Sequence, residues 1–279
     1  MIDDPRRFHL ELMRKYRLRP DRKLGQHFLV DPVALERVVS AASLQGDETV
    51  LEIGAGLGAL TVRLADRARE VIAVEYDRRL MPALREVVGT NPRVQLVSAD
   101  ILEVNLADLL GARPYRVVAN IPYQITSMLL RRLLEREPVP DRLVLTVQRE
   151  VAERVASGPG EMSLLALGVQ MYGVPTVVGR VLSGSFLPPP DIDSAILRVD
   201  LHPRPIVPSQ LVGPVFRLAR AGFAQKRKKL RNALAAGLAL EPAEVEPRLR
   251  AAGIDPSARA ETLGLADWQR LAEIWGALS

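Results

Sequence analysis

The central part of the chain, residues 49–199, alternates short apolar runs with segments of helical periodicity. The runs typical of strands are "TVLEIGAG", "EVIAVEYD", "RVQLVSADIL", "YRVVANIPY", "RLVLTVQ" and a last one over residues 195–201. Helical patterns such as "LTVRLADRA" and "SMLLRRLLE" lie between them. Strands joined by helices of this length form right-handed crossovers and a parallel sheet that is covered on both faces. The pattern therefore predicts an α/β fold for this region.

The pattern changes after the last expected strand. The stretch "HPRPIVPS" places three prolines in eight residues, which indicates a linker. Beyond it the periodicity is helical throughout, with helices expected over residues 210–223, 229–238, 244–252 and 265–277. We therefore expect a larger domain over residues 1–203, which includes a basic N-terminal arm, and a small all-helical domain over residues 204–279.

Glycines and a carboxylate occupy the ends of the first two expected strands. Gly54 and Gly56 follow the first strand, where they allow a sharp turn and a close approach of the backbone to a ligand. Glu75 ends the next strand, where its carboxylate can accept hydrogen bonds from both ribose hydroxyls of a nucleoside. Because "GAGLGA" also fits the dinucleotide-binding pattern, a nicotinamide or flavin dinucleotide is an open alternative, as is a tight turn beside a solvated glutamate.

The third and fourth expected strands also end in polar residues. Asp100 follows the third strand, where its carboxylate can accept a hydrogen bond from an adenine amino group or can simply cap a helix. The fourth strand runs into "NIPY", residues 120–123, in which asparagine and proline favour a turn but tyrosine does not. Since the carboxyl ends of parallel strands share one edge of a sheet, we expect Glu75, Asp100 and Asn120 to meet at a ligand site.

Composition limits the chemistry that the chain can perform. Its 279 residues are 48% hydrophobic and 25% charged, as in ordinary globular proteins. There is no cysteine, and His9, His27 and His202 are the three histidines, so disulfides, thiolate catalysis and a zinc site are not expected. No apolar run reaches the roughly 18 residues of a membrane span, and the N-terminus lacks the apolar core of a secretory signal. We therefore expect no metal, no membrane association and a cytoplasmic location.

Basic residues, which give the chain a formal net charge of +5, are concentrated at two places. Eight lie between Arg6 and Lys23 beside two acidic residues, and seven lie between Arg217 and Arg231 with no acidic residue among them. One such cluster is compatible with a solvated helix face, whereas two favour a nucleic-acid partner. The residues expected to bind RNA phosphates are Arg220, Lys226, Arg227, Lys228, Lys229 and Arg231.

Several motifs occur together in a family-specific order. "LEIGAGLGALT", "VEYD", "SADIL" and "NIPY" resemble the successive motifs of class I S-adenosylmethionine-dependent methyltransferases, and "NIPY" is similar to the tetrapeptide of enzymes that methylate exocyclic or amide nitrogens. "KLGQHFLVD", "FLPPPDIDSAILRV", "QKRKKLRNAL" and "GIDPSARAETLGLADWQRLA" resemble the KsgA/RsmA family of small-subunit (16S) ribosomal RNA adenine dimethyltransferases. The resemblance extends from about residue 23 to the C-terminus.

The resemblance implies a Rossmann-like catalytic domain with a seven-stranded sheet that binds S-adenosylmethionine, and a helical C-terminal domain that binds RNA. The cofactor-binding residues that it implies are Gln26, His27, Leu29, Gly54, Gly56, Glu75, Tyr76, Asp100, Ile101 and Asn120. Many relatives have asparagine where His27 stands. The catalytic residues that it implies are Asn120, Pro122, Tyr123 and Phe186.

The chemistry expected of "NIPY" concerns the exocyclic nitrogen of adenine, whose lone pair is delocalised into the ring. Two acceptors, the Asn120 side-chain oxygen and the backbone carbonyl of Ile121 or Pro122, would favour a pyramidal nitrogen whose lone pair faces the methyl group. Tyr123 and Phe186 would stack on an adenine drawn out of its helix or loop.

The implied activity is the dimethylation of two adjacent adenosines near the 3′ end of small-subunit rRNA, in an assembling pre-30S particle and by a monomeric enzyme. One alternative is an Erm-type methyltransferase that acts on large-subunit (23S) rRNA, although "RAETLGLADWQRLAEIW" favours the small-subunit family. Another is a non-catalytic ribosome assembly factor, against which the intact Glu75, Asp100 and "NIPY" argue. A dinucleotide oxidoreductase would leave "NIPY" unexplained.

Overall fold

The computed structural model describes residues 4–277. Internal contacts divide the chain into two compact units. The first comprises the chain up to Ala152 together with Pro175–Leu201, and the second comprises Glu153–Val174 together with the chain from His202 onward. The division at residues 201 and 202 lies close to the boundary expected from the proline-rich stretch, and residues 153–174 group with the C-terminal helices.

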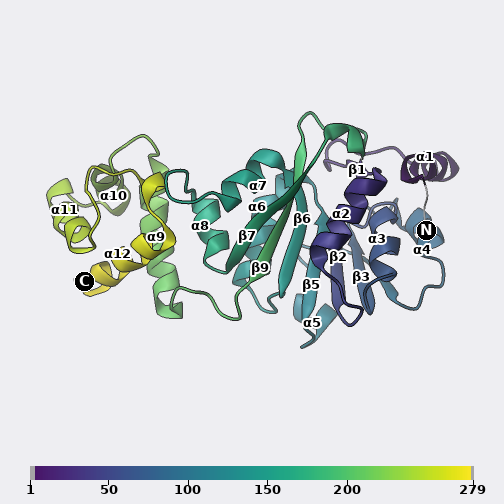
Figure 1. The fold of residues 1–279 in the computed structure, drawn as a ribbon, viewed down its shortest axis with the longest axis horizontal. Helices are drawn as coiled ribbons and strands as arrows, with labels where there is room; N and C mark the ends of the chain where they lie inside the picture. The colour runs from purple at the N-terminus through teal and green to yellow at the C-terminus, as the bar shows by residue number, and fades with distance from the viewer. Residues whose placement is uncertain (1–3, 278–279) are drawn as a thin grey trace. The chain divides into compact units, whose positions relative to one another are not determined.

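A seven-stranded sheet forms the centre of the first unit, and the expected α/β class is confirmed (Figure 1). Its strands are β2 (Thr49–Ile53), β3 (Glu70–Glu75), β4 (Val94–Ser98), β5 (Tyr115–Asn120), β6 (Arg142–Gln148), β7 (Gly173–Val181) and β9 (Ser194–Leu201). They follow the order β4-β3-β2-β5-β6-β9-β7. The strands from β4 to β6 are parallel, and β9 runs antiparallel to β6.

The chain reverses its direction of travel across the sheet at β2. From β2 it adds β3 and β4 on one side, and it then returns to place β5 and β6 on the other. Ile53 of β2 is paired with Val74 of β3 and with Ala119 of β5, so the three strands end at one level. The carboxyl ends at such a reversal are the usual ligand site of open parallel sheets.

Helices cover the sheet because its central strands are mostly apolar and largely buried. Every residue of β2 is buried, which is typical of a strand covered on both faces. The helices of this unit are α1 (Pro5–Lys15), α2 (Pro32–Ala42), α3 (Ala59–Ala65), α4 (Met81–Val88), α5 (Leu106–Leu110), α6 (Thr126–Glu135) and the start of α7 (Arg149–Ala156). Figure 1 shows α2 and α3 over one face of the sheet, where α2 packs against β5, β6 and β9.

Two features of the first unit, strand β7 and a small second sheet, were not predicted from the sequence. Strand β7 forms the edge of the sheet, and its exposed Val174, Val177 and Val178 do not alternate with buried residues. A small two-stranded sheet pairs β1 (Phe28–Leu29) with β8 (Phe186–Leu187) in antiparallel register. This pairing joins segments that are 158 residues apart, which local periodicity cannot predict.

The second unit is helical, as expected. Its helices after α7 are α8 (Leu164–Gln170), α9 (Ser209–Ala224), α10 (Leu230–Leu238), α11 (Pro242–Ala251) and α12 (Leu265–Ala277). The last four agree with the expected ranges to within two residues at each end. They enclose an apolar core that contains the fully buried Trp268. Gly222 of α9 is required there, because a Cβ at this position would lie 2.6 Å from the Trp268 ring.

Two absences apply to residues 4–277. No helix in this part of the chain is both long and apolar enough to span a bilayer. Within the same residues no three histidine or acidic side chains gather in a group that could hold a metal ion.

Candidate active site

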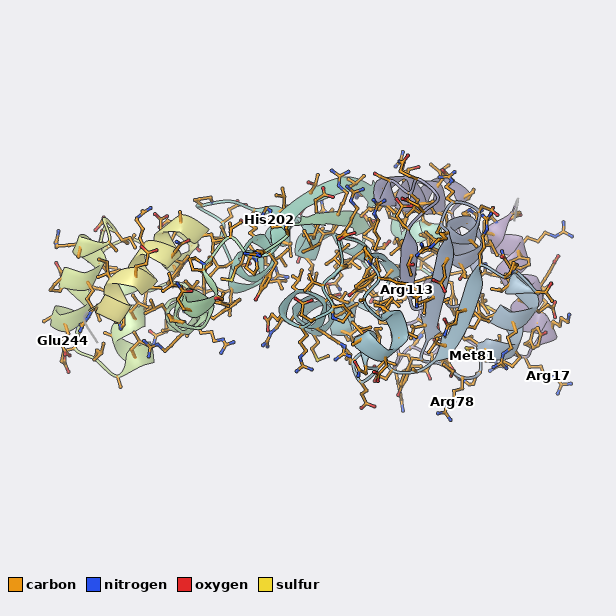
Figure 2. All side chains as sticks on the ribbon, turned by 90° about the horizontal axis from the view of Figure 1, so that it is seen from below. Arg17, Arg78, Met81, Arg113, His202 and Glu244 are labelled. Carbon is orange, nitrogen blue, oxygen red and sulfur yellow. The ribbon has the colours of Figure 1, made fainter. Side chains whose placement is uncertain are left out.

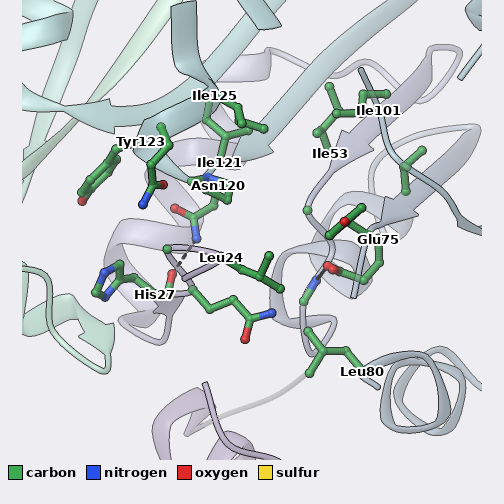
Figure 3. Close-up of a pocket in the computed structure, with 18 of the residues that line it drawn as sticks. Leu24, His27, Ile53, Glu75, Leu80, Ile101, Asn120, Ile121, Tyr123 and Ile125 are labelled. Atoms are coloured by element: carbon green, nitrogen blue, oxygen red, sulfur yellow. Dashed lines mark hydrogen bonds between the residues drawn. The ribbon is translucent and has the colours of Figure 1, made fainter. Parts of the chain in front are cut away.

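A cavity of about 270 Å³ opens where β2, β3, β4 and β5 end, at the chain reversal (Figure 3). All of the expected catalytic residues and, except for Leu29, all of the expected cofactor-binding residues line it. Leu29 lies instead in the core, 4% exposed, and its backbone pairs with that of Phe186. Leu29 therefore supports the wall of the cavity from behind.

The glycine turn after β2 forms the floor between the two halves of the sheet. Gly54 and Gly56 both have positive φ angles, +76° and +59°, which favour glycine. A Cβ at Gly56 would lie 3.0 Å from the Phe28 ring, and one at Gly54 would lie 3.3 Å from the Asn120 carbonyl oxygen. The absence of side chains at both positions thus keeps the cavity open and lets β2 approach β5.

Glu75 is a buried carboxylate aimed at this turn. Its Oε2 accepts the backbone N–H of Gly56 at 2.8 Å, and its Oε1 accepts the backbone N–H of Asp77 at 2.7 Å. Burial raises the pKa of Glu75, while the N–H donors of Asp77 and Gly56 act in the opposite direction. Each carboxylate oxygen keeps a further lone pair, so the group can accept the two hydroxyls of a ribose in the way the sequence suggested.

Asp100, Ile101 and Tyr76 form the next part of the wall. The Asp100 carboxylate accepts the backbone N–H of Leu102 through Oδ1 at 2.8 Å, so it caps the turn after β4. No described residue donates to its Oδ2, which stays available to a purine amino group. Ile101 is 4% exposed and Tyr76 is 59% exposed, which places a buried and an open apolar surface beside the acid. This wall suits an adenine ring.

Asn120 ends β5 and has a defined amide orientation. Its Nδ2 lies 3.0 Å from the backbone carbonyl oxygen of His27 (Figure 3). Because a carbonyl can only accept, the amide must present its N–H group there, and Oδ1 is left free of any described donor. The oxygen that the sequence reasoning required as an acceptor is therefore the unoccupied one.

The two carbonyl groups that follow Asn120 differ in their occupancy. The Pro122 carbonyl accepts the backbone N–H of Ile125 at 3.2 Å, whereas no described residue donates to that of Ile121. Pro122 has φ −57° and ψ 134° and leads directly into the short helix Tyr123–Ile125. Of the two candidates, the Ile121 carbonyl is the one with its acceptor capacity free.

The aromatic residues of the cavity have different environments. The Tyr123 hydroxyl hydrogen-bonds with the Ser194 hydroxyl at 2.7 Å, which holds its ring at the cavity edge. Phe186 contacts the cavity but is only 1% exposed, since it belongs to the main apolar core. The His27 ring lies nearly parallel to that of Tyr123, with centroids 6.2 Å apart.

Gln26, in the N-terminal segment that lines the cavity, is held by Asp77, a residue that the sequence did not lead us to expect in the site. Gln26 Nε2 donates to Asp77 Oδ2 at 2.8 Å, and its Oε1 accepts the backbone N–H of Asp21. Asp77 is 6% exposed and pairs with Arg79 at 2.7 Å; this hydrogen-bonded arginine is the main cause of the lowered pKa of Asp77. Asp77 stands two residues after Glu75, and only the fold shows that it faces Gln26.

Exposed arginines surround the N-terminal part of the first unit. Arg17 and Arg78 project away from the ribbon (Figure 2). Both are exposed, and neither forms an ion pair with a described residue. Arg17 of the N-terminal basic cluster and Arg78 thus offer free positive charge on the unit that carries the cavity.

The C-terminal basic cluster lies in a turn, where a helix face was the alternative considered from the sequence. Lys226, Arg227, Lys228 and Lys229 are all exposed between α9 and α10, and they form no ion pair with the described residues. Lys229 is the N-cap of α10 and makes no side-chain capping bond. Positive charge is unfavourable at a helix N-terminus, so the run does not stabilise α10 and is better suited to an anionic partner.

The other two residues expected to contact RNA, Arg231 and Arg220, interact with side chains of the second unit. The Arg231 guanidinium pairs with Glu246 at 2.9 Å. The Arg220 guanidinium lies 5.8 Å from the centre of the Phe216 ring, and its side chain is exposed. Arg220 can therefore meet a phosphate without breaking an ion pair, whereas Arg231 has to share its charge.

The chain is similar in sequence to ribosomal RNA methyltransferases over almost its entire length. The family model described as Ribosomal RNA adenine dimethylase matches residues 18–276. Ribosomal RNA small subunit methyltransferase A of Dehalococcoides mccartyi is 44% identical over 266 residues, covering 95% of this chain and 91% of that protein. The protein of the same name from Moorella thermoacetica is 41% identical, with 93% of each chain covered.

Solved structures of related enzymes have the same fold. The 23S rRNA methyltransferase ErmE is 30% identical with a TM-score of 0.72, covering 88% of this chain and 98% of that one. A dimethyladenosine transferase from Plasmodium falciparum is 25% identical with a TM-score of 0.75, covering 88% and 96%. The sheet, the cavity at its reversal and these similarities agree: the chain belongs to the ribosomal RNA adenine dimethylase family, whose fold is the Rossmann-like one of S-adenosylmethionine-dependent methyltransferases.

Proposed function

We propose that this protein dimethylates the exocyclic amines of two adjacent adenosines near the 3′ end of small-subunit (16S) rRNA during ribosome biogenesis. The observation that carries the proposal is the oriented Asn120 amide, whose Oδ1, like the carbonyl of the next residue, Ile121, receives no described hydrogen bond. The choice of the small subunit is supported by relatives of 36–44% identity that are named Ribosomal RNA small subunit methyltransferase A.

S-adenosylmethionine is the methyl donor, and the cavity suits its nucleoside part. Glu75, already held by two backbone N–H groups, would accept the ribose hydroxyls, and Asp100 Oδ2 would accept from the adenine amino group. Gln26, Gly54 and Gly56 would enclose the remainder. When bound, the donor supplies an electrophilic methyl group on a sulfonium.

The residues of "NIPY" prepare the target amine for attack. Asn120 Oδ1 and the Ile121 carbonyl would accept its two N–H groups, which localises the nitrogen lone pair and directs it toward the methyl group. The Asn120 amide is held by the His27 carbonyl before a substrate arrives, so this acceptor would require little reorganisation. Because the nitrogen bears positive charge as the new bond forms, the same acceptors stabilise the transition state more than the ground state.

Tyr123 and the basic clusters hold the RNA. The Tyr123 ring would stack on the target adenine once the base leaves its stacked position, with Phe186 closing the wall behind it. Lys226–Lys229 and Arg220 would contact phosphates. We take the enzyme to act as a cytoplasmic monomer on a pre-30S particle, whose RNA it would recognise by shape and unpaired bases.

The test is to incubate the protein with radiolabelled S-adenosylmethionine and, separately, undermethylated small and large ribosomal subunits, followed by nucleoside analysis. Dimethyladenosine in small-subunit RNA alone is the expected result. Label in large-subunit RNA would instead identify an Erm-type enzyme. Binding of S-adenosylmethionine without label in either RNA would overturn the enzymatic proposal and favour an assembly factor.

A further inference from the structure

The stretch "GIDPSAR", residues 253–259, does not line the cavity, although it belongs to the motifs on which the family resemblance rests. It follows α11 and lies in the second unit. Its middle forms a tight turn, residues 255–258, in which the Ala258 N–H donates to the Asp255 carbonyl at 3.0 Å. Asp255 and Ser257 are exposed, so packing in the core does not account for these two residues.

The Asp255 carboxylate holds this turn through two bonds to one residue. Its Oδ1 accepts the Ser257 N–H at 2.8 Å, and its Oδ2 accepts the Ser257 hydroxyl at 2.6 Å. These bonds are the main causes of the lowered pKa of Asp255, so the group is ionised in neutral solution. Pro256, between the two bonded residues, restricts the backbone further. The direction of the Pro256 carbonyl is thereby set.

The same turn supplies the cap that α10 lacks. Lys229, the N-cap residue of this helix, makes no side-chain capping bond. The Leu230 N–H donates instead to the Ala258 carbonyl at 2.7 Å, and the Arg231 N–H donates to the Pro256 carbonyl at 3.4 Å. A helix N-terminus needs such acceptors, because its first N–H groups have no partner within the helix. The start of α10, and with it the basic turn that leads into the helix, is thus fixed by a segment from beyond α11.

We propose that Asp255 is a positioning residue for RNA binding, which acts through the turn 255–258 to hold the basic turn Lys226–Lys229 in one conformation. This proposal rests on the function proposed above, in which the basic turn contacts RNA phosphates, and specifies how that contact is prepared. Long cationic side chains on a fixed backbone lose less conformational entropy on binding than those on a mobile one. An acidic residue would thus strengthen the binding of a polyanion, against the effect of its own charge.

Two substitutions at Asp255 separate geometry from charge. Asp255→Asn removes the charge but keeps a side-chain oxygen for the Ser257 N–H, so the turn persists. Asp255→Ala removes the charge and both bonds. Charge alone predicts that both variants bind RNA more tightly than the wild type, whereas positioning predicts that Asp255→Ala binds RNA more weakly and Asp255→Asn does not.

Glu244→Ala is the matched control within the same unit. The Glu244 carboxylate accepts the Glu241 N–H at 2.8 Å in the capping box of α11. Its loss therefore also removes one negative charge and one helix cap, but the cap serves α11 rather than α10. Thermal unfolding shows whether the control and Asp255→Ala lose similar stability.

The measurements on the full chain are the Kd for undermethylated small subunits at several salt concentrations and the hydrogen exchange of peptides that contain Leu230 and Arg231. We expect Asp255→Ala to raise the Kd roughly 3- to 10-fold, the cost of ordering one long side chain, and to speed exchange at the start of α10. Asp255→Asn and Glu244→Ala should bind the small subunit at least as tightly as the wild type.

Asp255→Ala that binds the small subunit as tightly as the wild type would overturn the proposal, as would a loss of equal size in Asp255→Asn or in Glu244→Ala. If Asp255→Ala does not fold, Ser257→Gly takes its place, because it removes the hydroxyl bond, loosens the turn and leaves every charge unchanged. Weaker RNA binding is expected of Ser257→Gly, and unchanged binding would refute the role of the turn.

The change of Lys226, Arg227, Lys228 and Lys229 to glutamine, in the same assay, separates this proposal from the function on which it rests. If that variant binds the small subunit like the wild type, the basic turn makes no RNA contact, and the proposed function fails at this point. If it binds more weakly while Asp255→Ala does not, Asp255 alone has been misassigned.

Discussion

Asn120 shows how one side-chain amide sets the chemistry of the cavity. Its position follows from β5, but the orientation of its amide follows from a carbonyl 93 residues earlier in the chain, that of His27. The free Oδ1 is the atom that would act on the reacting amine, and it does not contact the part of the cavity near Glu75. Binding of the donor and turnover should therefore depend on different residues.

Replacing Asn120 by alanine removes this acceptor, so turnover should fall far more than S-adenosylmethionine affinity. We expect kcat for small-subunit methylation to drop on the order of 10²- to 10³-fold, as for other prearranged transition-state contacts. The Kd for S-adenosylmethionine, measured by calorimetry, should change only a few-fold.

Asn105→Ala is the matched control for this change. Asn105 is the N-cap of α5 and accepts the N–H of Ala107, outside the cavity lining. Its loss should cost about 1 kcal/mol of stability and leave kcat unchanged. Equal losses of turnover and donor affinity in Asn120→Ala would contradict the role assigned to its oxygen.

Glu52 is a second residue with an unusual environment, since it lies in the middle of β2 and is 1% exposed. Neither of its carboxylate oxygens has a hydrogen-bond partner among the described residues. Burial raises the pKa of Glu52 to about 8, and the Glu75 carboxylate contributes in the same direction. The folded protein therefore holds a proton on Glu52 that the unfolded chain releases near pH 4.5.

This difference predicts that Glu52 makes the protein less stable as the pH rises from about 4.5 to 8. In that range the folded state binds more protons than the unfolded state, so the free energy of unfolding falls with pH. Glu52→Gln removes the effect. The free energy of unfolding of this variant, minus that of the wild type, should therefore increase by ~2–4 kcal/mol between pH 4.5 and pH 8.5. Denaturant unfolding at several pH values measures the difference, and parallel curves for the two proteins would refute the prediction.

At the scale of elements, two helical glycines have opposite surroundings, Gly222 in α9 and Gly276 in α12. Gly222 packs against Trp268 of α12, with 2.6 Å between a Cβ there and the ring, and against Leu230 at 3.2 Å. A Cβ at Gly276 would meet nothing within 4 Å. Both positions are helical, so the contact that an added methyl group would make is what distinguishes them.

Alanine should have opposite effects at these glycines. Gly276→Ala should raise the free energy of unfolding by up to about 1 kcal/mol, because alanine is the better helix former. Gly222→Ala should lower it by ~1–3 kcal/mol, because the Trp268 ring must move within a packed core. Hydrogen exchange of α9 and α12 in the full chain, together with thermal unfolding, measures both changes. If Gly222→Ala were more stable than the wild type, the Trp268 ring would have moved aside at little cost, which would contradict the prediction.

At the scale of the whole molecule, exposed positive charge on both units is suited to binding a polyanion. Each unit carries exposed basic residues without described ion-pair partners, Arg17 and Arg78 on the first and the turn Lys226–Lys229 on the second. Neutralising one cluster should therefore weaken RNA binding without abolishing it, and should leave the cavity intact.

Changing Lys226, Arg227, Lys228 and Lys229 to glutamine should reduce the salt dependence of small-subunit binding by about one unit of log–log slope for each phosphate that is no longer neutralised. The Kd for S-adenosylmethionine should not change. Arg131→Gln is the control, because Arg131 on α6 pairs with Glu135 at 3.2 Å and should contribute little to the slope. An unchanged slope in the quadruple variant would make the turn an ordinary solvated surface.

Much of the fold could be predicted because its causes are local. The buried strands are mostly apolar runs, of which β2 leads into a glycine turn and β3 and β5 end in polar residues, and the C-terminal helices have clear periodicity. Strand β7 escaped prediction because an edge strand with exposed valines lacks alternation. The pairing of β1 with β8 escaped because its partners are distant in sequence.

The sequence by itself determined the order of the strands along the chain, the type of residue at each strand end and the family to which these motifs point. These depend on periodicity and on residue identity, which are readable one segment at a time. Only the tertiary structure decided which oxygen of the cavity is free, that Gln26 is held by Asp77, and that the Phe186 ring lies in the apolar core. Each of these is set by a contact between segments far apart in the chain, and such contacts exist only after the sheet has brought the segments together.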